Sequence, residues 1–165
     1  MNAFWSYFWP CFGFGLIVGI VAGRFAWRRR SRRNSALALG VAFALGLAAL
    51  WHGPLGGSDR FAAKVELSIH DMLVHYEMTQ VTAHLHRGPL TRRVMLSGPA
   101  DDFQRQGLIE YLDQLPGVED ATWSTKGGTP LIAEGMAVSV AGFLFGLLLA
   151  YLVELRRRYN SQWNW

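Results

Sequence analysis

Three long apolar runs constrain the fold of this chain more than any other feature. They cover Phe4–Gly23, Ser35–Trp51 and Gly135–Val153. A helix that crosses a hydrocarbon core of ~30 Å needs about 17–25 apolar residues, so the first and third runs fit well and the second fits at the short end. The second run could instead be a buried helix of a water-soluble domain, but the arginines before it and Trp51 at its end favour a membrane span. We predict transmembrane helices over residues 1–27, 35–51 and 131–155.

The interiors of these runs contain no Asp, Glu, Lys, Arg or His. Charged groups inside a membrane mark ion and proton pathways, so the sequence argues against a transporter or a proton relay. Cys11, the only cysteine of the chain, lies in the first run, which excludes an intramolecular disulfide and a cysteine-rich zinc site. We expect Cys11 to be a small, buried apolar side chain.

Two arginine clusters beside the runs predict the orientation of the chain. One follows the first run and the other lies near the C-terminus: Arg24, Arg28, Arg29, Arg30, Arg32 and Arg33, then Arg156, Arg157 and Arg158. Basic residues beside transmembrane helices stay on the cytoplasmic side. The predicted cytoplasmic parts are therefore a loop over residues 28–34 and a tail over residues 156–165. The N-terminus and the segment between the second and third spans lie on the opposite side, which in a bacterial inner (cytoplasmic) membrane is the periplasm.

The formal net charge of +4 comes from these clusters. Between His52 and Thr129 the chain has seven Lys or Arg against ten Asp or Glu, a net of −3. Because the basic residues are explained by orientation and the middle segment is acidic, we expect no nucleic-acid partner. Trp163 and Trp165 in the tail are expected to rest in the membrane interface, with docking on a cytoplasmic partner as the alternative.

Glycines recur every four residues in two of the runs. They are Gly15, Gly19 and Gly23 in the first and Gly142 and Gly146 in the third. Small residues at this spacing share one helix face and let two membrane helices approach closely. We predict that these glycines are helix-packing residues. Their partner is left open between another span of the chain and another protein, including a second copy in a homo-oligomer.

The segment between the second and third spans has the pattern of a small folded domain. Apolar residues at helical spacing predict an amphipathic helix over Asp59–Tyr76, with a stripe of Phe61, Val65, Ile69, Leu73 and Tyr76. The stretch Thr79–His86 alternates between apolar and polar residues, as in a half-buried strand. After the turn "RGPL", Thr91–Ser97 predicts a second strand.

The stretch "LSGPADDFQRQ" (Leu96–Gln106) ends that strand and starts a second helix. Asp101 with Gln104 three residues later is a capping-box pattern, and Asp102 suits the positive end of a helix dipole. The expected apolar stripe consists of Phe103, Leu108, Leu112 and Leu115. The helix stops at "LPGV", and a third strand can follow over Glu119–Ser124. The predicted fold is an α+β membrane protein whose middle domain has the order helix, strand, strand, helix, strand.

This order, together with "LSG" at Leu96–Gly98 and "LPGV" at Leu115–Val118, resembles the BON domain, a small αββαβ module of bacterial envelope proteins. The resemblance covers residues 59–125, inserted between transmembrane helices. It implies a non-enzymatic domain that binds phospholipid surfaces or other envelope proteins.

Residues with possible chemistry have plainer explanations. Ser97 is not in a G-x-S-x-G elbow, so it does not match the nucleophile of a hydrolase. Asp101 and Asp102 would diverge by about 100° on a helix, so they do not form a catalytic carboxylate pair. His84 and His86 share a strand face, but a zinc site needs a third ligand that the pattern does not supply. We therefore expect no catalytic residues, no metal and no cofactor.

The sequence predicts a non-catalytic protein of the inner membrane whose BON-like domain attaches to lipid or to an envelope component. The alternative is an accessory subunit of a larger membrane complex, of the respiratory or photosynthetic type, that packs through its spans. The expected partners are membrane lipids and other membrane or envelope proteins.

Overall fold

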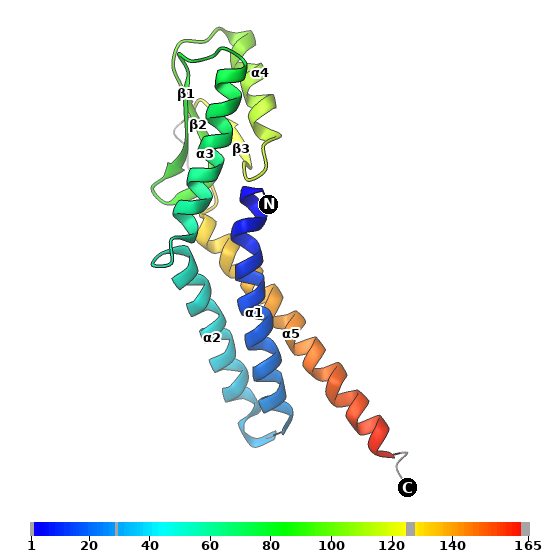
Figure 1. Ribbon diagram of the computed structural model, residues 1–165. Coiled ribbons are helices and arrows are strands. Elements are labelled where there is room, and N and C mark those ends of the chain that lie inside the picture. Colours follow the sequence, from blue (N-terminus) through cyan, green and yellow to red (C-terminus); the bar gives the residue numbers. More distant parts are fainter. Residues whose placement is uncertain (1, 29, 125–127, 163–165) are drawn as a thin grey trace. The chain divides into compact units, whose positions relative to one another are not determined.

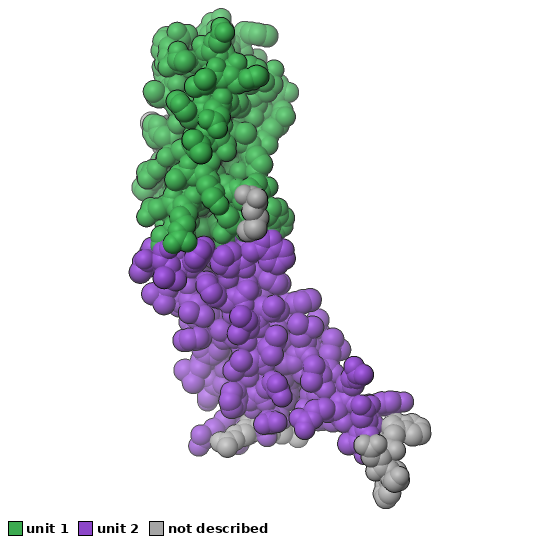
Figure 2. Space-filling view, in the orientation of Figure 1, with its two compact units in different colours: residues 1–7, 56–134 green, residues 8–55, 135–165 purple. Residues whose placement is uncertain are grey.

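The computed structural model describes residues 2–28, 30–124 and 128–162 (Figure 1). Within these residues the chain is mostly helical with one small three-stranded sheet, which is an α+β composition. The elements are α1 (Ala3–Arg28), the 3₁₀ turn η1 (Arg30–Arg32), α2 (Arg33–His52), α3 (Gly57–His75), β1 (Thr82–Arg87), β2 (Leu90–Ser97), α4 (Asp102–Asp113), β3 (Asp120–Thr122) and α5 (Leu131–Gln162). Two compact units divide the chain (Figure 2): unit 1 comprises residues 1–7 and 56–134, and unit 2 comprises residues 8–55 and 135–165.

Three helices of the described chain, α1, α2 and α5, are long and apolar enough to cross a membrane, which identifies a membrane protein. They run further than the predicted spans. Arg28 ends α1 and Arg33 begins α2, while Arg156–Arg158 continue α5. Arginine is a good helix former, so Arg28, Arg33 and Arg156–Arg158 belong to helices, while Arg30 and Arg32 lie in the connecting turn η1. Arg29, Trp163, Trp165 and the end of the predicted middle domain at Thr125 lie outside the described residues.

Unit 1 contains the sheet, with the strand order β1-β2-β3. β1 and β2 form an antiparallel hairpin in which Leu85 pairs with Val94. β3 lies parallel to β2, with Val94 paired to Ala121, and α4 supplies the crossover that parallel pairing needs. Leu85, Val94 and Ala121 are all buried, so one face of the sheet carries the core. α3 packs against β1 and α4 against β3.

The helices of unit 1 bury most of the predicted apolar stripes, namely Phe61, Val65, Ile69 and Leu73 on α3 and Leu108 and Leu112 on α4. Two assignments to these stripes are wrong. Tyr76 is the C-terminal capping residue of α3 and is 44% exposed. Phe103 is 87% exposed, because five residues before Leu108 correspond to about 140° of rotation around the helix.

The first residues of α1 and α5 also belong to unit 1. The Nε of Arg92 on β2 lies 2.7 Å from Oε2 of Glu134 in the first turn of α5. The same guanidinium lies 5.6 Å from the ring centroid of Phe4 in α1. Tyr7 is 1% exposed, and its ring centroid is 5.7 Å from that of Phe61. The beginnings of both helices are therefore part of the core and the charge pairing of unit 1.

Unit 2 is built from the remaining parts of α1, α2 and α5. Its buried cluster joins Ala22, Ala44 and Phe143, one from each helix. Gly40 of α2 lets Phe143 approach, because a Cβ at Gly40 would lie 2.9 Å from the Phe143 ring. Ser139 of α5 is fully buried, and its hydroxyl donates a hydrogen bond of 3.2 Å to the carbonyl oxygen of Ala44. Small residues and the hydrogen bond from Ser139 therefore connect α2 to the other two helices.

Candidate functional site

The serine and the first aspartate of Leu96–Gln106 have structural partners. The hydroxyl of Ser97 lies 2.7 Å from that of Thr82, its neighbour across β1 and β2. The Asp101 carboxylate accepts a hydrogen bond of 2.7 Å from the backbone N–H of Gln104. The Gln104 side-chain oxygen accepts one of 3.1 Å from the N–H of Asp101, which completes the capping box. These groups pair two strands and start α4, and Asp102 is the first residue of that helix.

The histidines of the hairpin lie on β1. His84 pairs with Met95 of β2, and the Nδ1 of His86 lies 3.0 Å from the carbonyl oxygen of Pro89. Within the described residues, no group of three or more His, Cys, Asp or Glu side chains is placed to hold a metal ion.

The predicted packing glycines of α1 and α5 face each other inside unit 2. Four of them lie against a backbone carbonyl of the opposite helix, so that a Cβ at any of them would meet that oxygen. The pairs are Gly15 with Ser139, Gly19 with Phe143, Gly142 with Phe12, and Gly146 with Leu16. Such close approach permits Cα–H···O contacts between the helices. We refer to these four glycines as the glycine contact, and it joins two helices of one chain.

Gly23, the fifth predicted packing residue, has a different neighbour. A Cβ at Gly23 would lie 2.5 Å from the indole of Trp27 and 2.8 Å from the Cβ of Ala150. The glycine therefore makes room for the Trp27 ring, whose centroid is 5.8 Å from that of Tyr151 on α5.

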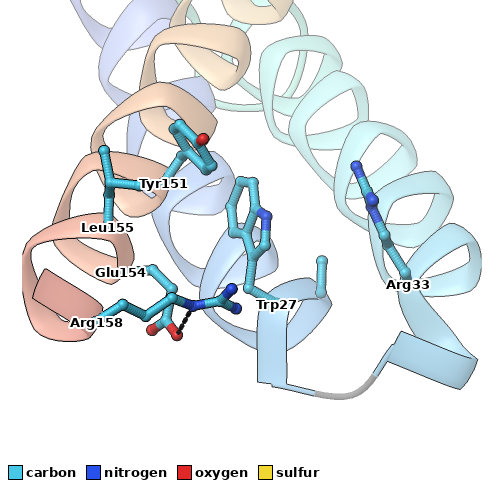
Figure 3. Close-up of a pocket in the computed structure, with 7 residues that line it drawn as sticks. Trp27, Arg33, Tyr151, Glu154, Leu155 and Arg158 are labelled. Atoms are coloured by element: carbon cyan, nitrogen blue, oxygen red, sulfur yellow. Dashed lines mark hydrogen bonds and ion pairs between the residues drawn. The ribbon is translucent and has the colours of Figure 1, made fainter. Parts of the chain in front are cut away.

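Trp27 and Tyr151 line a pocket of about 300 Å³ at the arginine end of unit 2 (Figure 3). The arginine-end pocket is lined by Ala26, Trp27, Arg33, Tyr151, Glu154, Leu155 and Arg158. Figure 3 shows the α5 residues on one side of the Trp27 indole and Arg33 on the other. Arg158 donates a hydrogen bond of 3.2 Å from Nε to the Glu154 carboxylate. The pocket thus combines two guanidinium groups, one carboxylate and two aromatic rings.

A second cavity, of about 200 Å³, shares Ala26, Trp27, Arg33 and Tyr151 with this pocket. Its other lining residues are Leu37, Leu147 and Leu148. Leu147 and Leu148 precede Tyr151 by one turn of α5, toward the apolar middle of the helix. A charged pocket therefore continues into an apolar groove along the same helices.

Unit 1 carries exposed aromatic residues on α4 and at the end of α3. Tyr76 and Tyr111 stack with ring centroids 4.8 Å apart and an interplanar angle of 22°, and both are more than 40% exposed. Phe103 lies eight residues before Tyr111, about two turns along α4 and about 80° around the helix axis. Gly107 stands between them, and a Cβ there would be 3.9 Å from the Tyr111 ring. We refer to Tyr76, Phe103 and Tyr111 as the aromatic surface.

Sequence reasoning missed both the aromatic surface and the arginine-end pocket. Phe103 was expected in the core, and the one signal against it is its spacing from Leu108. The pocket joins the consecutive helices α1 and α2 with α5, whose lining residues come more than a hundred positions later in the sequence. The only sequence signal for it is that Arg stands near Trp or Tyr at both places. No protein-family model, curated protein or solved structure matches this chain.

Proposed function

We propose that this chain is a non-catalytic protein of the bacterial inner membrane whose BON-like αββαβ domain binds another envelope protein. The domain corresponds to α3, β1, β2, α4 and β3 of unit 1, and the arginine clusters support a periplasmic placement. The order of elements and the hairpin followed by a parallel third strand support the resemblance.

The aromatic surface is the observation that carries the binding role. Single exposed apolar residues are common, but here one member of a stacked and exposed tyrosine pair lies on the same helix as a phenylalanine that is 87% exposed, about 12 Å away along α4. Tyrosine and phenylalanine are enriched in protein interfaces, because they bury much apolar area with few rotatable bonds. The acidic balance of the segment opposes tight attraction to anionic lipid, so a protein is the favoured partner.

The arrangement of Ser97 and Asp101 supports a non-catalytic role. The serine hydroxyl is paired with Thr82, and the aspartate caps α4. A nucleophile needs a neighbouring base that is itself oriented by a third group, and these contacts supply none.

The accessory-subunit alternative would need a contact surface other than the glycine faces of the spans. Four of the packing glycines are engaged between α1 and α5 of the same chain. A larger membrane complex would therefore have to contact the outer faces of the spans, where large side chains such as Ile17, Leu39 and Phe43 are exposed.

Photo-cross-linking in native membranes tests the binding role. A photoreactive phenylalanine analogue replaces Phe103 in the full-length chain, and the matched control places it at Leu67, an apolar residue of α3 that is 61% exposed. We expect one discrete protein adduct from position 103 that disappears when Tyr76 and Tyr111 are both changed to Ala. Equal adducts from both positions, or adducts with lipid alone, would contradict the proposal.

Thiol labelling tests the orientation. Cys11 is fully buried, so new cysteines at Gln106 on α4 and Asn160 on α5 can be compared. In cells with a permeabilised outer membrane, a membrane-impermeant maleimide should label position 106. Position 160 should react only after the inner membrane is opened. The reverse pattern would place the domain in the cytoplasm.

A further inference from the structure

The arginine end of unit 2 is strongly basic, and several of its arginines line cavities between the helices. Residues 8–55 and 135–165 contain nine arginines, no lysine and one acidic residue, Glu154. Arg33 and Arg158 line the arginine-end pocket, and Arg24, Arg28 and Arg157 line an adjoining cavity that also contains Trp27 and Glu154. An orientation signal requires only basic residues beside a span; it requires neither a cavity nor aromatic walls.

The geometry assigns this pocket to the headgroup phosphate of an anionic phospholipid, with one acyl chain in the adjoining apolar groove. Basic pockets between transmembrane helices bind anionic lipid headgroups, and arginine matches phosphate oxygens with two parallel hydrogen bonds. This site lies on unit 2 and is independent of the partner proposed for unit 1.

The ion pair within the pocket orients one of the two guanidinium groups. Glu154 accepts its hydrogen bond from the Nε of Arg158. Within the described residues, this bond leaves the two terminal amino groups of Arg158 for a ligand. Arg33 is exposed at the first position of α2, and no ion pair or hydrogen bond joins its side chain to another described residue. Arg158 and Arg33, from different helices, thus line one pocket on either side of the Trp27 indole (Figure 3).

The apolar groove distinguishes a lipid from a free phosphate ion. Leu37, Leu147 and Leu148 line a cavity that shares Trp27, Arg33 and Tyr151 with the charged pocket. A phosphate ion has no apolar part that could contact these leucines, whereas the acyl chains of a phospholipid lie directly below its headgroup. Trp27 and Tyr151 have the aromatic character of residues at the headgroup level.

Competition between lipids of equal chain length tests the proposal on the full-length protein. The purified chain is incubated with equimolar dioleoyl phosphatidylglycerol and dioleoyl phosphatidylcholine, and the retained lipid is counted by native mass spectrometry. We expect preferential retention of phosphatidylglycerol. A chain without this preference would overturn the proposal.

Matched double variants separate the pocket from general surface charge. Arg33→Gln with Arg158→Gln removes both pocket arginines, and Arg32→Gln with Arg156→Gln removes the same charge from the same two clusters outside this pocket. At roughly fivefold per arginine, the pocket variant should lower the preference on the order of 25-fold, whereas the control should change it by less than about fivefold. Equal losses in both would mean diffuse attraction and would refute a site.

A further variant tests the groove without changing charge. Leu37→Trp fills the apolar cavity and should reduce phosphatidylglycerol retention while every arginine is kept. Inorganic phosphate in millimolar excess should not displace the lipid. If phosphate displaces it fully and Leu37→Trp has no effect, the pocket is a site for the free ion and the lipid assignment is wrong.

Discussion

Unit 1 is packed through large side chains, whereas the contact between α1 and α5 in unit 2 is made by glycines. The core of unit 1 is made of large side chains, and Phe61, Ile69, Leu85 and Leu112 are each at most 1% exposed. In unit 2 the closest contact between α1 and α5 is made by glycines that lie against backbone carbonyls. Water drives large apolar side chains together, whereas lipid is as apolar as leucine and supplies no such force. Helices in lipid are held together instead by van der Waals contacts between closely packed backbones, and such close packing requires small residues at the contact.

A substitution should therefore have opposite consequences in the two units. Shortening a side chain should damage unit 1, because it leaves a cavity. Lengthening one should damage unit 2, because the opposite backbone has no space to yield. The following variants test this contrast in the full-length chain in detergent micelles.

Leu85→Ala should have the largest effect. Leu85 is fully buried on β1, so the truncation should lower the free energy of unfolding of unit 1 by about 2–5 kcal/mol. Hydrogen exchange of the β2 amides measures this loss. Leu67→Ala, at an exposed position of α3, is the control and should stay within about 0.5 kcal/mol. Similar losses in both variants would show that unit 1 has no such core.

Gly19→Ala should have the second-largest effect. The new methyl group would meet the Phe143 carbonyl oxygen, so the free energy of unfolding of unit 2 should fall by about 1–3 kcal/mol. Titration with a denaturing detergent, followed by tryptophan fluorescence, measures the change. Gly13→Ala on the same helix is the matched control, since a Cβ there has no neighbour within 4 Å. If both variants unfold alike, the glycine contact does not hold the helices.

Asp101→Ala should have a moderate effect on unit 1. Loss of the capping box should lower the free energy of unfolding by about 1 kcal/mol. It should also increase hydrogen exchange of the Gln104 amide, which donates to the Asp101 carboxylate in the unmodified chain. Asp71→Ala removes the same charge from an exposed position of α3 and should leave this amide unchanged. Equal exchange in Asp101→Ala and the unmodified chain would contradict the cap.

Ser139→Ala should have the smallest effect. The buried hydroxyl donates to the Ala44 carbonyl, and hydrogen bonds between membrane helices average about 0.6 kcal/mol. The same detergent titration measures it. A loss as large as that of Gly19→Ala would mean that polar contacts, and not close approach, hold unit 2.

Local patterns predicted the elements of the chain well. Helical spacing of Phe61, Val65, Ile69 and Leu73 predicted α3, and alternation around Leu85 predicted β1. Asp101 and Gln104 predicted the start of α4, because a capping box lies within four residues. Three apolar runs predicted the three helices that are long enough to cross a membrane in the described chain.

Contacts between distant residues could not be predicted from these patterns. The partner of Gly19 is more than a hundred residues away, at Phe143, so the sequence left a second protein open as the partner. Arg92 pairs with Glu134 and lies over Phe4, and nothing near Arg92 in the sequence indicates either contact. The arginine-end pocket depends in the same way on how three helices converge.

Intramolecular cross-linking tests the glycine contact most directly. The rings of Phe12 and Phe145 lie 6.2 Å apart beside it, so cysteines at these two positions, in a chain with Cys11→Ala, should be joined by a short bismaleimide within one chain. Cysteines at Gly13 and Phe145 form the control pair, because Gly13 faces open space. We predict an internally linked monomer from the first pair and none from the second. Linkage only between chains would contradict the account.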